Sequence, residues 1–159
     1  MNSGFAVLLL ALGIGVVAGL RSLTAPAVVA WAAHLGWINL HGSPMAFMGS
    51  VWAVVIFTVL AVVELVADQL PTTPSRTAPV GLSARIVTGA LSGACLGIAG
   101  SSVLWVGALA GALGGIAGAF GGYQARVGLV RILRVSDFAI AIPEDLVAIG
   151  LGLLLVSRF

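Results

Sequence analysis

The sequence has no lysine and few charged residues of any kind. Only 8% of its 159 residues are charged, all seven basic residues are arginine, and the net charge is +2. Soluble domains contain about 25% charged residues, whereas here 60% of the residues are hydrophobic and the mean hydropathy is +1.20. This composition excludes a soluble globular domain. The small net charge also argues against nucleic acid as a partner.

Disulfide bonds and familiar catalytic motifs are excluded as well. The single cysteine, Cys95, cannot form an internal disulfide and lies among small residues typical of helix packing. The sequence contains no P-loop, HExxH, GxSxG or CxxC pattern. His34 and His41 lie near tryptophans, as residues at a membrane interface do, without neighbouring carboxylates or thiols. We therefore expect no catalytic residue and no cofactor, and the sequence leaves a metal site undetermined.

Six long apolar runs occupy most of the chain. They cover residues 4–20, 23–40, 44–70, 82–100, 102–122 and 138–156. A helix needs roughly 20 apolar residues to cross a bilayer. The runs therefore predict one transmembrane domain over residues 1–159, folded as an all-α bundle of six spans, the first retained rather than cleaved as a signal. In the alternative, residues 23–40 form a re-entrant half-helix and five helices cross.

The distribution of arginines predicts the orientation of the bundle. With six spans, six of the seven arginines lie on one side and only Arg158 lies on the other. Because basic loops stay cytoplasmic, we expect a multi-pass protein of the plasma (inner) membrane with both termini outside. The two halves have similar lengths, and ELVA at 64–67 is similar to EDLVA at 144–148. This weak similarity suggests a three-plus-three inverted repeat.

Four of the five acidic residues lie within or at the ends of apolar runs. They are Glu64, Asp68, Glu144 and Asp145. An acid at the centre of a span costs roughly 2.5–3.5 kcal/mol, so such residues usually face a protein interior or a water-filled cavity. The acids could form a site for an ion, a proton or a polar ligand. They could equally be structural partners of Arg21, Arg85 and Arg126, and the sequence leaves both readings open.

The segment GLRSLTAP, residues 19–26, joins the first two runs and is a second candidate site. Ser22 or Thr24 could cap the second helix, and Pro26 suits a first helical turn. The free amides of a helix start, beside Arg21, would bind a carboxylate or phosphate. The alternative is a capped tight turn with no ligand.

Basic residues in two other segments predict contacts with anionic lipid headgroups. Arg76 lies in the loop after the third run, and the amphipathic stretch 123–135 contains Arg126, Arg131 and Arg134. This stretch fits a helix lying at the membrane surface. It also fits a cytoplasmic loop that obeys the charge rule.

Glycines in the fifth run form two ridges on one helix. They are spaced four apart, as Gly107, Gly111 and Gly115 on one ridge and Gly114, Gly118 and Gly122 on the other. Such ridges allow helices to approach closely. The partner could lie within the chain or in a second subunit of a homo-oligomer.

Three stretches of the sequence stand out together: GLRSLTAPAVVAW from Gly19, ELVADQLPTTPSRT from Glu64 and EDLVAIGLGLLLV from Glu144. In combination they resemble a bacterial family of small membrane proteins catalogued as domain of unknown function 4126. The resemblance covers nearly the whole chain and implies a membrane fold, but no activity. The family's Glu, Asp and Pro at an acidic helix end match Glu64, Asp68 and Pro71. Longer relatives have further aspartates in the next loop, where this chain has Pro74, Ser75 and Arg76, so any cation bound by those aspartates need not bind here.

Three functions fit these features. The leading hypothesis is a transporter or channel-like protein for a small solute or ion, in which the acidic residues line a polar cavity closed by Arg21. The second is a non-catalytic assembly or structural subunit, which the glycine ridges favour. The third, ranked last, is an enzyme acting on lipid-phosphate headgroups. In each case membrane lipids are the expected partners.

Overall fold

The computed structural model describes residues 4–67, 77–133 and 137–159. Over these residues the chain forms six α-helices, one short 3₁₀ helix and no strand. The elements are α1 (Gly4–Leu20), α2 (Thr24–His34), η1 (Ala46–Gly49), α3 (Val51–Ala67), α4 (Pro79–Ala99), α5 (Leu104–Leu133) and α6 (Asp137–Val156). The prediction of an all-α protein is confirmed.

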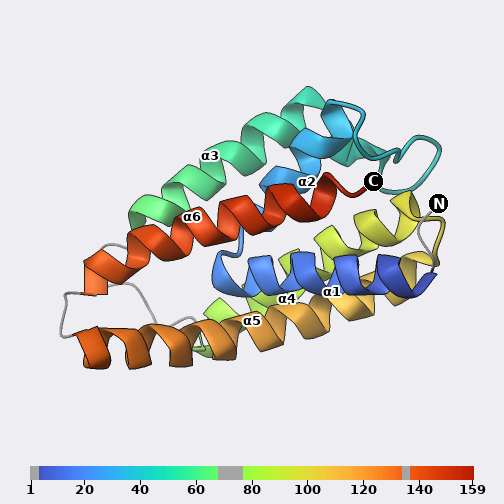
Figure 1. Cartoon of the computed structure of the whole chain (residues 1–159). Coiled ribbons are helices and arrows are strands. Elements are labelled where there is room, and N and C mark those ends of the chain that lie inside the picture. Colours follow the sequence, from blue (N-terminus) through green and yellow to red (C-terminus); the bar gives the residue numbers. More distant parts are fainter. Residues whose placement is uncertain (1–3, 68–76, 134–136) are drawn as a thin grey trace.

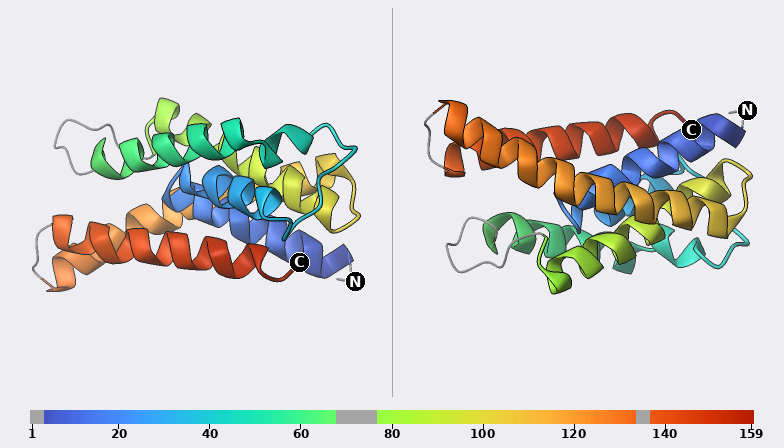
Figure 2. Two further views of the ribbon diagram at one scale, coloured as in Figure 1. Left: turned by 90° about the horizontal axis from the view of Figure 1, so that it is seen from above. Right: turned by 90° about the horizontal axis from the view of Figure 1, so that it is seen from below.

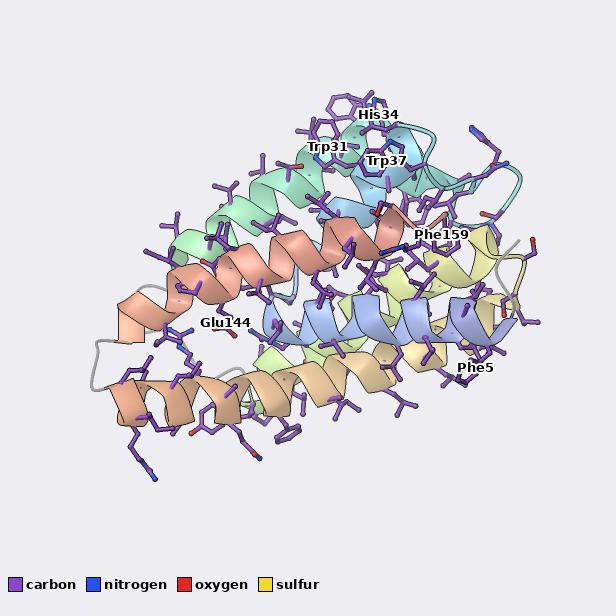
Figure 3. The ribbon with its side chains drawn as sticks, in the orientation of Figure 1. Phe5, Trp31, His34, Trp37, Glu144 and Phe159 are labelled. Atoms are coloured by element: carbon purple, nitrogen blue, oxygen red, sulfur yellow. The ribbon has the colours of Figure 1, made fainter. Side chains whose placement is uncertain are left out.

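Consecutive α-helices run in opposite directions along one elongated bundle (Figures 1 and 2). The first turn of α1 and the last turn of α6 lie at the same end of the bundle, which we call the terminal end. At the opposite end, the last turns of α5 and the first turns of α6 extend beyond the end of α1 (Figure 1). Figure 3 shows Trp31, His34 and Trp37 grouped toward the terminal end.

Two predicted segments have different boundaries in the structure. The apolar run 23–40 is helical only over Thr24–His34, and residues 35–50 form turns and η1. Gly36 and Gly42 have φ angles of 77° and 74°, which glycine adopts without strain and which end a helix. The basic stretch 123–135 does not form a separate interfacial helix, because α5 continues without a break to Leu133.

Among the residues that the structure describes, α4 and α5 are long and apolar enough to cross a bilayer by length and composition. The apolar helices α1 and α3 have 17 residues each, about 26 Å at 1.5 Å per residue. With 11 residues, α2 reaches only about 16 Å. The sequence-based expectation of membrane helices is therefore supported for α4 and α5.

Glycines bring the backbones of α1, α4 and α5 into contact. On α5, one ridge (Gly107, Gly111, Gly115) faces α4 and the other (Gly114, Gly118) faces α1, and Gly122 is also buried. A Cβ added at Gly111 would overlap the carbonyl oxygen of Gly89 in α4, and one added at Gly118 would overlap that of Val16 in α1. Both ridges thus pack inside the chain, each on a different neighbour.

Large apolar side chains cover the outside of the bundle. Trp52, Val80 and Ile132 are 76%, 81% and 77% exposed. Many large apolar side chains are exposed in the same way on the described helices, as expected for a surface that meets lipid or another apolar partner.

Candidate functional site

The turn between α1 and α2 lies inside the bundle rather than at its end. Just before the turn, Gly19 lies against the backbone of α5 at residues 115–119, near the middle of that helix. Arg21 and Ser22, in the turn itself, are only 0% and 7% exposed. The chain therefore places a polar segment at the level of the midpoint of its longest helix.

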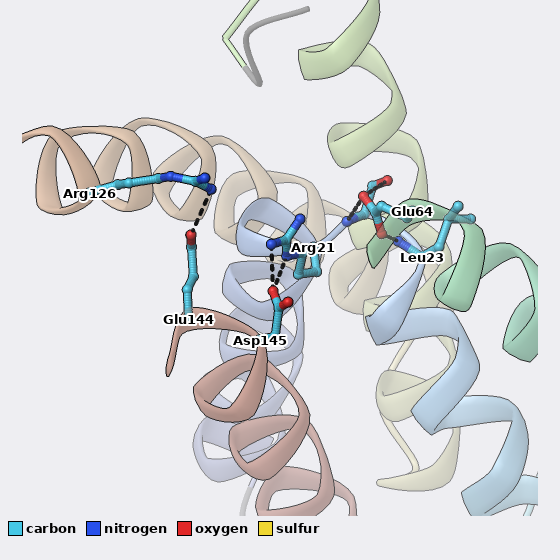
Figure 4. A network of polar contacts seen from close by, with 7 residues as sticks. Arg21, Leu23, Glu64, Arg126, Glu144 and Asp145 are labelled. Atoms are coloured by element: carbon cyan, nitrogen blue, oxygen red, sulfur yellow. Dashed lines mark hydrogen bonds and ion pairs between the residues drawn. The ribbon is translucent and has the colours of Figure 1, made fainter. Parts of the chain in front are cut away.

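Glu64 of α3 caps the start of α2. Its carboxylate accepts hydrogen bonds from the Ser22 amide at 2.8 Å, the Ser22 hydroxyl at 2.6 Å and the Leu23 amide at 2.8 Å (Figure 4). The α2 N-cap residue is Leu23, which makes no side-chain cap. The prediction that Ser22 or Thr24 caps this helix was therefore wrong, because a carboxylate from another helix satisfies the free amides.

Arg21 is paired with Asp145 of α6. Its Nε donates to Oδ1 of Asp145 at 2.6 Å, and an Nη atom lies 2.5 Å from the same oxygen. Arg21 is fully buried and the Asp145 side chain is 13% exposed. A buried guanidinium needs such a partner, because an uncompensated charge in the interior costs several kcal/mol.

Arg85 of α4 is bonded to backbone carbonyls in this region. Its side chain is buried, with Nε donating to the Gly19 carbonyl at 3.1 Å and Nη1 to the Gly81 carbonyl at 2.9 Å. The Gly19 carbonyl belongs to the last turn of α1, where carbonyls lack partners within the helix. Arg85 therefore fixes the end of α1 against α4.

A second ion pair lies farther along α5 and α6. Glu144 points from α6 toward α5 (Figure 3), and its Oε2 accepts from Nη1 of Arg126 at 3.3 Å. Both side chains are mostly buried, at 11% and 13% exposed. This pair joins α5 to α6 (Figure 4).

We refer to Arg21, Ser22, Leu23, Glu64 and Asp145 as the polar junction. Four elements meet there, because α1 and α2 supply the turn while α3 and α6 supply one carboxylate each. The positive N-terminus of α2 faces the Glu64 carboxylate and the Arg21 guanidinium faces that of Asp145, so each carboxylate has a positive partner. The same amides and hydroxyl could bind another carboxylate or a phosphate if Glu64 moved away.

The predicted site residues are distributed as follows. Arg21, Ser22, Glu64 and Asp145 meet in the polar junction, and Thr24 is buried at the first residue of α2. Glu144 pairs with Arg126 nearby, and Arg131 is exposed on α5. Asp68, Arg76 and Arg134 lie outside the described residues.

Sequence reasoning found part of this arrangement. It expected the amides at the start of the second helix to bind a carboxylate, and the Leu23 amide does so, although the carboxylate belongs to Glu64 of the same chain. It named Arg85 as a partner for acids, and it missed the bonds from Arg85 to carbonyl groups. The position of Arg85 inside an apolar run was the available signal, since a buried arginine must find acceptors.

Hollows among the described residues also lie at other places. One of about 520 Å³ is lined by Ser101, Ser102, Arg158 and neighbouring residues. One of about 250 Å³ includes both histidines, and an apolar groove of about 320 Å³ lies between α2 and α3 beside Trp31. Within the described ranges, no three histidine, cysteine or acidic side chains lie close enough together to hold a metal ion.

Residues 8–157 match the model of a protein family described as Domain of unknown function (DUF4126). The chain belongs to this family. The match spans all of the polar junction and every helix apart from the first four residues of α1. No curated protein and no solved structure matches the chain. The family membership predicted from the three sequence stretches is confirmed, whereas a bacterial origin stays a prediction.

Proposed function

We propose that this DUF4126 protein is a membrane transporter or channel for a small solute or ion, with the polar junction as its binding or gating site. The supporting observation is that the junction brings the buried Arg21 guanidinium together with carboxylates from α3 and α6 inside an apolar bundle. Buried charges inside a membrane protein usually serve a pathway for ions or solutes.

The proposal includes six chain crossings, with α2 as a short crossing segment. Alternating helix directions and the apolar outer surface support it (Figure 1). Basic residues Arg21, Arg85, Arg126 and Arg131 lie away from the terminal end, whereas Arg158 lies near it, so the rule for basic loops favours both termini outside a plasma (inner) membrane. The inverted repeat gains no support, since α2 has 11 residues and its counterpart α5 has 30.

A ligand screen by thermal stability tests the proposal. Purified protein would be heated with single ions, small anions, metabolites or lipid headgroups, beside the Glu64→Gln variant. A ligand that binds only the folded state stabilises it by about 2.7 kcal/mol at a hundredfold excess over Kd. We expect at least one ligand to stabilise the wild type and not the Glu64→Gln variant. A ligand that stabilises both equally would place binding away from the junction.

A second candidate is a non-transporting assembly subunit. It is favoured by the observation that Glu64, Glu144 and Asp145 are all bonded to groups on other elements, as purely structural residues would be. It predicts that the protein co-purifies with a larger partner and that Glu64→Gln leaves this complex intact. Activity on lipid-phosphate headgroups stays the last candidate, and metal-dependent turnover of an anionic lipid would be its test.

A further inference from the structure

Helix α3 has fewer neighbours than the other long helices. Among the described elements it packs mainly against α2 and η1. Only Ala53, Val54 and Ala61 of its 17 residues are buried. Its last turns, from residue 62 to 67, contain no buried residue. Little apolar packing therefore fixes the end of α3 that lies away from the terminal end.

Polar contacts hold α3 at two levels. Midway along the helix, the Trp31 indole donates to the Thr58 hydroxyl at 3.0 Å, beside the apolar groove between α2 and α3. Near its C-terminal end, Glu64 accepts the three hydrogen bonds from Ser22 and Leu23. Glu64 thus links this end of α3 to the α1–α2 turn.

The start of α3 has the features of a pivot. Gly49 ends η1, Ser50 is extended with φ −74° and ψ 151°, and α3 begins at the next residue. The Ser50 hydroxyl accepts a hydrogen bond from the Ala53 amide at 3.1 Å, which caps the helix. The cap keeps α3 intact as a rigid rod, while the extended residue before it permits a change of direction.

We propose that α3 pivots at Gly49–Ser50 and that Glu64 is the latch that keeps it closed against the α1–α2 turn. When the latch opens, the amides of Ser22 and Leu23 lose their acceptor and become available to another anion. The use of this movement in transport rests on the proposed function, but the movement itself does not. The latch explains why a carboxylate from α3, rather than a local side chain, caps α2.

Distances between paired spin labels test the latch without any substrate. Labels at Val66 and Leu146, both exposed, would report the end of α3 beside Glu64. Labels at Val55 and Leu154, also exposed, would report the terminal end of the same two helices. The background would replace the buried Cys95 by alanine, so that no third thiol is present.

In the Glu64→Gln variant we expect a second, longer distance for the Val66–Leu146 pair and an unchanged distance for the Val55–Leu154 pair. Glu144→Gln is the matched control, because it removes one acid from the Arg126 pair and should leave both distances unchanged. Ser22→Ala removes one of the three donors to Glu64. It should populate the longer Val66–Leu146 distance less than Glu64→Gln does, and it replaces Glu64→Gln in the test if that variant does not fold.

Two results would overturn the latch. One is an unchanged Val66–Leu146 distance in both Glu64→Gln and Ser22→Ala. The other is an equal shift at both pairs of labels, which would indicate general loosening rather than pivoting. A distance shift in a protein that moves no solute would instead contradict the proposed function and leave the latch standing.

Discussion

Gly111→Ala should destabilise the fold, whereas alanine at an unpacked glycine of the same helix should not. A Cβ at this position would overlap the Gly89 carbonyl oxygen and lie 2.9 Å from the Gly93 Cα, so α4 has to move away. Backbone atoms cannot rotate aside as side chains do. Overpacking of this kind typically costs about 1–3 kcal/mol, and the better helix propensity of alanine returns at most about 1 kcal/mol.

Gly121→Ala on the same helix is the matched control. No atom lies within 4 Å of a Cβ built there, so only the helix propensity changes, and stability should stay equal or rise by up to about 1 kcal/mol. Reversible unfolding in mixed detergent micelles would measure both variants. If Gly111→Ala proved as stable as Gly121→Ala, the close contact between α4 and α5 would be wrong.

Two further predictions concern the polar junction. Asp145→Asn should cost about 3–5 kcal/mol, because it removes the charge of the carboxylate that is paired with the buried Arg21 guanidinium. The added change Arg21→Met should recover part of that loss in the same unfolding assay, and additive losses would contradict the pairing. Ser22→Ala should cost about 1.5–3 kcal/mol, since the lost hydrogen bond goes to a charged acceptor. It should also speed hydrogen exchange of the Leu23 amide, and unchanged exchange would show that Glu64 does not depend on the Ser22 hydroxyl.

The sequence predicted the helices well because apolar runs determine them. It predicted α2 poorly, because the run 23–40 is apolar throughout while its helix ends at His34. The break depends on glycines with positive φ, and a glycine in an apolar run can equally lie within a helix. The length of α5 was underestimated for a related reason, since polar residues after Gly122 were taken as a separate segment although they continue the helix.

The composition of the polar junction was predictable, but its pairing was not. Few charged residues occur in the apolar runs, so Arg21, Glu64 and Asp145 stood out at once. Three arginines and four acids can pair in many ways, and residues such as Arg21 and Asp145 lie 124 positions apart. The packing of α3 and α6 around the α1–α2 turn decides which of them meet, and periodicity does not reveal that packing.

The most direct test of the account is solute flux into liposomes that contain the purified protein. The wild type, Glu64→Gln, Asp145→Asn and the control Glu144→Gln would be compared with any ligand found by the stability screen. We predict flux with the wild type and with Glu144→Gln, and a loss of at least tenfold with the two junction variants, provided that all four proteins are folded. Equal flux through all four proteins would contradict the claim that the polar junction is the functional site.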